Sequence, residues 1–286
     1  MQNYAIITDS GCDLPQAMLE QLQLISIPLY ITYNGENMPD TVDDSITAIY
    51  DGLRHGAQAT TCAANPDNWT TAIEPVLQSG RDALVITFSS GLSTTYQSAV
   101  IAAQDLSEQY PQRKVLVVDG LSASLGQGLL LWYTCKKRDE GLSLEELAAW
   151  VEANKLHLCH WFTVDDLMFL KRGGRISAAT ALVGTMLQIK PVLHVDDEGH
   201  LINVAKARGR KASIDALAAK LGQAGDYDNS TVFICHGDCI DDARYLEKLV
   251  KEKYGVKEVV IGYTGAVIGS HSGPGTLALF FLGDKR

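Results

Sequence analysis

The chain has 286 residues, of which 46% are hydrophobic and 20% charged, and its formal net charge is -10. This length can bury one large core or two modest ones, and the composition is that of a globular protein. The acidic balance argues against a nucleic-acid partner, which needs a basic face, and against docking on an anionic membrane. The sequence has no run of about 20 apolar residues, so we expect no stable membrane insertion.

The N-terminus and the cysteines predict a cytoplasmic protein. The stretch from Met1 to Asp9 carries neither a basic region nor a long apolar core, so we expect no signal peptide. Of the six cysteines only Cys235 and Cys239 lie close together, and their spacing matches neither a redox motif nor a paired zinc motif. The histidines also lack the spacing of metal ligands. We therefore expect reduced thiols, no metal and no cofactor.

Strand and helix patterns alternate over the first 155 residues. Short apolar runs rich in β-branched residues and bounded by turn residues predict strands, and Ser, Asp or Pro before periodic apolar stretches predicts helix starts. Such alternation predicts a layered α/β domain with a mostly parallel sheet, residues 1–155. Strands are expected at 4–8, 24–33, 82–88 and 114–118, and helices at 15–22, 45–53, 66–77, 99–106, 122–137 and 143–155.

After residue 155 the pattern changes to hairpins mixed with helices. A turn rich in Asp and Gly separates two strand-like runs, 189–195 and 201–207, which predicts a hairpin. This mixture predicts an α+β domain with a mixed sheet, residues 156–286, sharing a substantial interface with the first domain. The other strands are expected at 158–164, 231–235 and 258–263, and the helices at 211–221 and 241–254.

A loop rich in hydroxyl groups follows the expected strand 82–88. Ser89-Ser90-Gly91 breaks the strand, and Ser93 stands where the N-cap of the next helix is expected. A helix N-terminus presents backbone N–H groups and a favourable dipole to an anion. With no Lys and one Gly, the loop suits a carboxylate better than a triphosphate. An ordinary capped turn is the alternative interpretation.

Two other loops offer similar chemistry. Thr60 and Thr61 begin an expected hydroxyl-containing loop, and Gly269 to Thr276 is expected to hold His271 in a loop with an unusual backbone. Three loops that supply hydroxyls and an imidazole can hold one carboxylate without a full cation. An incidental surface histidine in a tight turn is the alternative for His271.

Positive charge is concentrated at Lys171 to Arg175 and at Lys206 to Lys211. Glycines beside arginines allow close approach to a phosphate, so these stretches predict phosphate contact or docking of an acidic or nucleotide-loaded partner; a solvated loop is the alternative. No nucleophile elbow surrounds Ser90, and no nucleotide or magnesium motif is present. The residues indicate a binding protein with a polar anion clamp beside an apolar cavity. The walls of this cavity are expected at 182–187 and 278–282. Packing in an ordinary hydrophobic core is the alternative explanation for these apolar stretches.

Five stretches of the sequence stand out together: 8–15 (TDSGCDLP), 89–93 (SSGLS), 170–176 (LKRGGRI), 190–193 (KPVL) and 273–276 (GPGT). Taken in order, they resemble the DegV family over essentially the whole chain. The family's best understood role is the fatty-acid-binding subunit of bacterial fatty acid kinase. The resemblance implies a lipid-binding protein, not itself an enzyme, that buries a long-chain fatty acid and presents its carboxylate to a separate ATP-dependent kinase subunit for acyl-phosphate formation.

The resemblance also implies site residues. Thr61, Ser93 and His271 match the carboxylate-binding positions, and Arg172 and Arg175 match a stretch expected at the rim of the site or in contact with a partner. The family usually follows its Thr with Ser-Gln-Pro-Ser, whereas here the run is Cys-Ala-Ala-Asn-Pro, residues 62–66. This difference removes a hydroxyl and a Gln near the anion.

Two other functions remain open on the sequence. One is a stand-alone hydrolase or transferase that acts on a small carboxylate or acyl substrate through Ser93 and His271. The other is a lipid-responsive interaction protein with no metabolic turnover.

Overall fold

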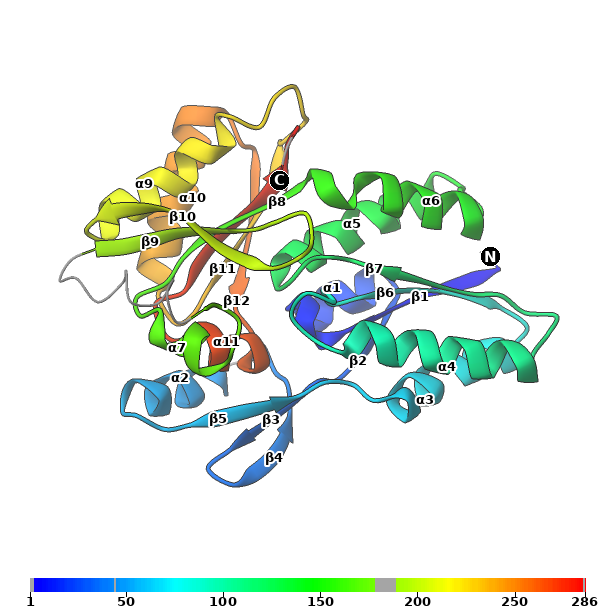
Figure 1. The fold of residues 1–286 in the computed structure, drawn as a ribbon. Helices are drawn as coiled ribbons and strands as arrows, with labels where there is room; N and C mark the ends of the chain where they lie inside the picture. The colour runs from blue at the N-terminus through cyan, green and yellow to red at the C-terminus, as the bar shows by residue number, and fades with distance from the viewer. Residues whose placement is uncertain (1–2, 44, 178–188, 285) are drawn as a thin grey trace.

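A four-stranded parallel sheet carries much of the N-terminal half of the chain (Figure 1). In this computed structural model, which describes residues 3–43, 45–177, 189–284 and 286, β1 and β6 are the central strands. Both strands are almost wholly buried, because helices cover the two faces of the sheet. The strand order is β2 (Leu24–Ile27), β1 (Tyr4–Asp9), β6 (Asp82–Thr87) and β7 (Val115–Asp119), with α3 (Pro66–Gln78) and α4 (Thr95–Gln109) on one face.

A six-stranded mixed sheet forms the second half. Its β11–β12 pair is parallel, whereas its other pairs are antiparallel. Together with the parallel sheet, it confirms the predicted α/β fold class. The strand order is β10 (Leu201–Arg208), β9 (Ile189–Val195), β8 (Leu158–Thr163), β13 (Leu277–Leu282), β11 (Thr231–His236) and β12 (Glu258–Tyr263), and α9 (Arg210–Leu221) and α10 (Ile240–Tyr254) pack on one face.

Helix α5 (Leu125–Asp139) lies between the two sheets and joins their cores (Figure 1). One hydrophobic cluster includes Leu84 of the parallel sheet, Leu129 of α5 and Phe280 of the mixed sheet. A Cβ at Gly126 would lie 2.2 Å from His160 Nε2, so glycine permits the close approach of α5 to β8. The division into domains at residue 155 stays a prediction, since this shared core belongs to both halves of the chain.

A small antiparallel sheet contains two segments whose secondary structure differs from the prediction. The single strand expected at 24–33 is divided into β2 and β3 (Tyr30–Tyr33), which belong to different sheets, because Pro28 cannot donate a ladder hydrogen bond. The expected loop at Thr60 is instead part of β5 (Ala59–Cys62), which pairs with β3. The third strand is β4 (Glu36–Pro39), which follows a turn at Asn34 and Gly35, both with positive φ.

The remaining helices are short or flank the sheets. None of the helices in the described ranges is long and apolar enough to cross a membrane. They are α1 (Gln16–Gln21), α2 (Ile46–Arg54), α6 (Leu144–Asn154), α7 (Met168–Arg172) and α11 (Ala266–Ser272), with short 3-10 turns η1 (Ser10–Cys12) and η2 (Lys155–His157).

Candidate functional site

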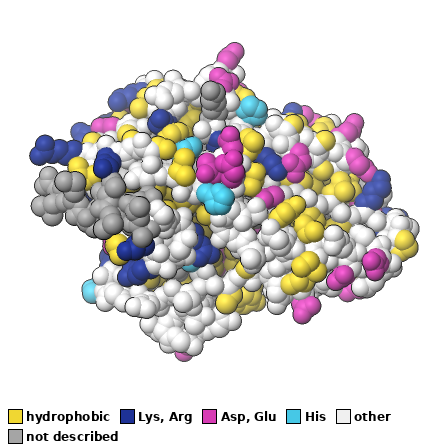
Figure 2. Space-filling view, in the orientation of Figure 1, with side chains coloured by type: hydrophobic (Ala, Val, Ile, Leu, Met, Phe, Trp, Pro, Cys, Tyr) yellow, Lys and Arg dark blue, Asp and Glu magenta, His cyan; other side chains and the backbone are white. Residues whose placement is uncertain are grey.

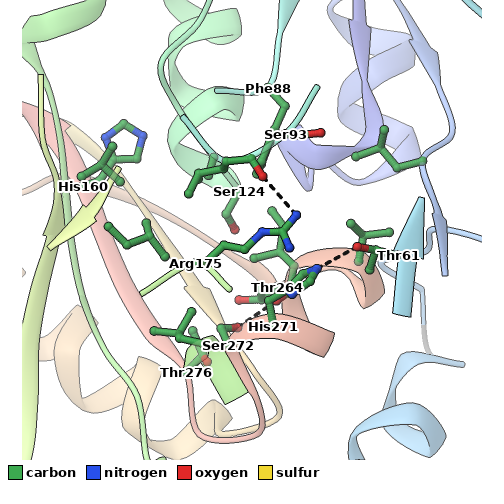
Figure 3. Close-up of a pocket in the computed structure, with 18 of the residues that line it drawn as sticks. Thr61, Phe88, Ser93, Ser124, His160, Arg175, Thr264, His271, Ser272 and Thr276 are labelled. Carbon is green, nitrogen blue, oxygen red and sulfur yellow. Dashed lines mark hydrogen bonds between the residues drawn. The ribbon is translucent and has the colours of Figure 1, made fainter. Parts of the chain in front are cut away.

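A cavity of about 600 Å³ lies between the elements of the two halves (Figure 3). Its volume falls within the range of about 300–1,000 Å³ usual for ligand pockets. Of the predicted walls, Ala278 and Phe280 line the cavity, whereas 182–187 lie outside the described residues. Among described residues, no Asp or Glu lines it. The apolar lining comprises Leu29, Ala63, Phe88, Leu92, Ala123, Phe162, Leu170, Val195, Leu201, Val267, Ile268, Ala278 and Phe280.

Two polar residues of the lining, Thr61 and His271, are joined by a hydrogen bond, and we call the part of the cavity beside this pair its polar end. Thr61 Oγ1 lies 2.7 Å from His271 Nε2, although 210 residues separate them in sequence (Figure 3). Thr61 comes from β5, whereas His271 stands in the last turn of α11, not in the expected loop. The helix ends after His271 because Gly273 adopts a φ of 81°, which favours glycine.

Contacts from the loop after β4 hold the first turn of α11. The Val267 N–H donates to Asp40 Oδ1 at 2.9 Å, and the Ala266 N–H donates to the Thr41 carbonyl at 3.1 Å. These bonds satisfy amide groups that have no partner within a helix. Helix α11 has only seven residues, and residues remote in sequence fix its position. It places His271 at the cavity.

The His271 imidazole is neutral near pH 7. Burial, together with the nearby charge of Arg175, lowers the pKa of His271 from 6.5 to about 4. In a neutral imidazole one ring nitrogen donates and the other accepts. When Nε2 donates to Thr61 Oγ1, the Thr61 hydroxyl proton is free to be donated to an anion in the cavity.

Ser93 lines the same cavity but does not cap α4 as predicted. The helix begins at Thr95 with Thr94 at its N-cap, and Ser93 Oγ accepts from the Thr95 N–H at 3.3 Å. Ser93 Oγ also lies 2.8 Å from Thr95 Oγ1. The structure thus brings Thr61, Ser93 and His271 to one cavity from three elements (Figure 3).

Arg175 adds a cation to this polar end. Its guanidinium donates to the Leu92 carbonyl at 3.1 Å, and the side chain lines the cavity (Figure 3). Burial lowers the pKa of Arg175, yet an arginine stays protonated at neutral pH. A cation therefore lies in the same cavity as the predicted clamp residues, and whether the clamp works without it stays a prediction. Arg172, by contrast, is exposed and lines a smaller neighbouring cavity.

The sequence reasoning also missed Ser124, which lines the cavity with a φ of 57° and donates to the buried Asp13 carboxyl. Burial raises the pKa of Asp13 well above its usual range and that of Asp9 to about 7. Asp9 Oδ2 accepts from the Phe88 N–H at 2.8 Å and so fixes a residue of the wall. The acidic motif at 9–13 was visible in the sequence, but its position behind the cavity depends on tertiary packing.

Gly173 allows the imidazole of His271 to approach its loop closely. A Cβ at Gly173 would lie 2.1 Å from His271 Nδ1, whereas the φ of -71° is one that alanine adopts freely. We expect Gly173→Ala to displace the ring, break the bond to Thr61 and destabilise the fold by about 1–3 kcal/mol, measured by thermal unfolding. Adding His271→Ala to this variant should then lower the free energy of unfolding little further. If the losses of the two single variants instead added in the double variant, the proposed clash would be contradicted.

Comparisons with known proteins show one consistent relationship. The family model that matches is described as an uncharacterised protein family, DegV, and it covers residues 3–284. A DegV domain-containing protein of Clostridium perfringens is 44% identical, with the alignment covering 100% of this chain and 99% of the relative.

Solved structures with the same fold have been described with fatty acids. A DegV family protein from Thermus thermophilus, reported for its fatty acid binding, has a TM-score of 0.87 and 32% identity, with 99% of this chain and 100% of that chain covered. The fatty acid kinase B3 protein of Streptococcus pneumoniae, loaded with linoleic acid, has a TM-score of 0.85 and 25% identity, with 99% and 100% covered.

Proposed function

The chain belongs to the DegV family, and from this we propose that it binds a long-chain fatty acid in the cavity of about 600 Å³ and presents the carboxylate to a separate ATP-dependent kinase subunit. The carboxylate is held by Thr61, Ser93 and His271, with Arg175 as the counter-charge. The fatty-acid ligands of the Thermus and Streptococcus proteins support the choice of ligand.

The observation that carries this proposal is a cavity with many apolar lining residues that also holds the Thr61–His271 pair, Ser93 and the cation of Arg175. Each buried methylene of an acyl chain contributes roughly 0.8 kcal/mol, so a chain of about sixteen methylenes binds tightly even after ordering costs. A carboxylate buried without partners would cost several kcal/mol. The hydroxyls of Thr61 and Ser93 and the guanidinium of Arg175 offset this cost.

The reaction that follows needs no proton transfer within this chain. A carboxylate oxygen forms a bond to the γ-phosphorus of ATP as the bond between that phosphorus and the ADP oxygen breaks. ADP leaves and an acyl phosphate remains. We assign the nucleotide and its metal to the partner subunit, and a cytoplasmic location follows from the need for ATP.

The hydrogen bonds around Ser93 and His271 favour binding over hydrolysis. A serine nucleophile needs a base within hydrogen-bonding distance. Ser93 Oγ instead contacts Thr95, and His271 Nε2 contacts Thr61. Ser93 therefore donates to the ligand directly, whereas His271 acts through the Thr61 hydroxyl that it orients.

Extraction of the purified protein with organic solvent, followed by mass spectrometry, tests the proposal. We expect a long-chain fatty acid at close to one molecule per chain, and acyl phosphate when a fatty acid kinase subunit and ATP are added. Fatty acid without acyl phosphate would support the lipid-responsive alternative. An empty protein that hydrolyses esters would overturn the proposal in favour of the hydrolase.

Cys62 offers a direct test of where the ligand lies. Its free thiol is exposed and lines the cavity beside Thr61. With fatty acid at about ten times its Kd, roughly a tenth of the protein is unliganded, so alkylation of Cys62 should slow about tenfold. The rate is measured with a maleimide by mass spectrometry, with Cys62→Ser as the unlabelled control. If fatty acid left the alkylation rate of Cys62 unchanged, the ligand would have to lie elsewhere.

A further inference from the structure

His160 is a polar residue in an otherwise apolar stretch of the cavity wall. It lies on β8, where Phe162, two residues further along, shares its face of the sheet. Phe280 of β13 stands directly opposite His160, and their ring centroids are 5.4 Å apart. All three side chains line the cavity. Figure 3 shows His160 well apart from the Thr61–His271 pair, so this stretch of wall faces ligand atoms remote from the carboxylate.

The hydrogen bonding of the His160 ring fixes which of its nitrogens carries the proton. Nδ1 lies 3.0 Å from the carbonyl oxygen of Leu158, which can only accept, so Nδ1 is the protonated nitrogen. Burial and the positive charge of Arg286 lower the pKa of His160 well below its usual value, so the ring is neutral near pH 7. Nε2 is therefore an acceptor with a free lone pair.

Within the described ranges no donor reaches Nε2 of His160, although this atom is buried. Gly126 of α5 packs against it, but the Gly126 N–H donates to the Ala123 carbonyl at 3.1 Å, and Arg286 donates to the Leu158 carbonyl at 3.2 Å. Charged side chains on the outer surface, as in Figure 2, have water as a partner, whereas His160 is only 1% exposed. Among the described residues that line the cavity, His160 alone has a buried side-chain nitrogen or oxygen without a hydrogen-bond partner.

A single water molecule is a poor partner for this nitrogen. A buried water usually makes about three hydrogen bonds to polar groups. The aromatic rings beside His160 offer none, and two hydroxyls of the lining already donate elsewhere. Ser124 Oγ donates to the Asp13 carboxyl, and Thr264 Oγ1 donates to Cys235 Sγ at 3.1 Å. The missing donor is therefore best supplied by the ligand itself.

We propose that His160 Nε2 accepts a hydrogen bond from a hydroxyl group on the acyl chain, so that the cavity selects a long-chain hydroxy fatty acid. This inference rests on the proposed function and defines its substrate class more closely. A plain fatty acid has no donor along its chain, whereas a hydroxyl placed against Nε2 satisfies both groups. A hydroxyl at another carbon would be buried without a partner, which weakens binding. The site therefore distinguishes ligands by the position of the hydroxyl along the chain.

A series of hydroxystearic acids that differ only in the position of the hydroxyl tests this inference, with stearic acid as the reference. Affinities are measured by displacement of a fluorescent fatty acid. In the native protein, one position or two adjacent ones should bind at least as tightly as stearic acid, and the others about tenfold more weakly. In His160→Phe, the affinity of the favoured isomer relative to stearic acid should fall about tenfold. His194→Phe is the matched control, since His194 lies on the neighbouring strand and does not line the cavity, and it should leave this ratio unchanged.

Nitrogen-15 NMR of the imidazole keeps the inference testable if His160→Phe does not fold. The Nε2 resonance of His160 should shift when the favoured isomer replaces stearic acid. The same resonance position with both acids would overturn the inference, because water or no donor at all would then face the ring. Equal weakening of every isomer in the native protein, or a preference that survives in His160→Phe, would also overturn it. If the native protein bound none of these acids, the proposed function itself would fail.

Discussion

Replacement of Arg175 by glutamine is expected to weaken fatty-acid binding by about 30-fold or more. The guanidinium lines the polar end of the cavity and is fixed there by its bond to the Leu92 carbonyl. Removing one partner of a buried charge pair costs about 2 kcal/mol or more, which corresponds to this factor. Affinity is measured by displacement of a fluorescent fatty acid, and Arg175→Lys, which keeps the charge without the planar fork, should lose less.

A second readout of Arg175→Gln reports on the site without ligand. The charge of Arg175 and burial both lower the pKa of His271 to about 4. Loss of the cation should raise that pKa, although continued burial keeps it below 6.5. An NMR titration of the imidazole measures the change. Native affinity together with an unchanged pKa of His271 would show that Arg175 does not face the carboxylate.

Local sequence patterns predicted the parts of the fold that depend on neighbours in the chain. The buried strand β6 and the parallel strand β7 follow from short apolar runs bounded by turn residues. The helix predicted to begin at residue 143 has Ser143 at its N-cap in a capping box, with Glu146 Oε2 accepting from the Ser143 N–H at 2.9 Å. These features need no information from distant residues, and so the fold class followed from the sequence.

The features that the sequence did not predict depend on partners far along the chain. Residues 59–62 form a strand because β3 pairs with them, and the helix carrying His271 exists because Asp40 and Thr41 hold its first turn. The Arg-Gly-Gly-Arg motif indicated anion chemistry, but its sequence could not separate the inward Arg175 from the exposed Arg172. Both line the smaller cavity, and Arg175 also reaches the main one, where it donates to the Leu92 carbonyl.

Truncation of Ser93 and His271 together to alanine is expected to leave the fold intact and to cut fatty-acid affinity by about tenfold or more. The variant loses the neutral hydrogen bond from Ser93 to the ligand, and such a bond contributes about 0.5–1.5 kcal/mol. The loss of His271 also frees Thr61 from the bond that orients its hydroxyl. Circular dichroism checks folding, and displacement of a fluorescent fatty acid measures affinity.

The matched control makes the same two chemical changes at positions that do not line the cavity, Ser107→Ala with His55→Ala. This variant should bind fatty acid as the native protein does. If Ser93→Ala with His271→Ala also bound normally, Arg175 alone would hold the carboxylate, and the hydroxyl and imidazole groups would serve the fold. A large loss that appears only when both residues change would instead show that the Ser93 hydroxyl and the oriented Thr61 hydroxyl can each satisfy the same carboxylate oxygen, because each single variant would keep one of them.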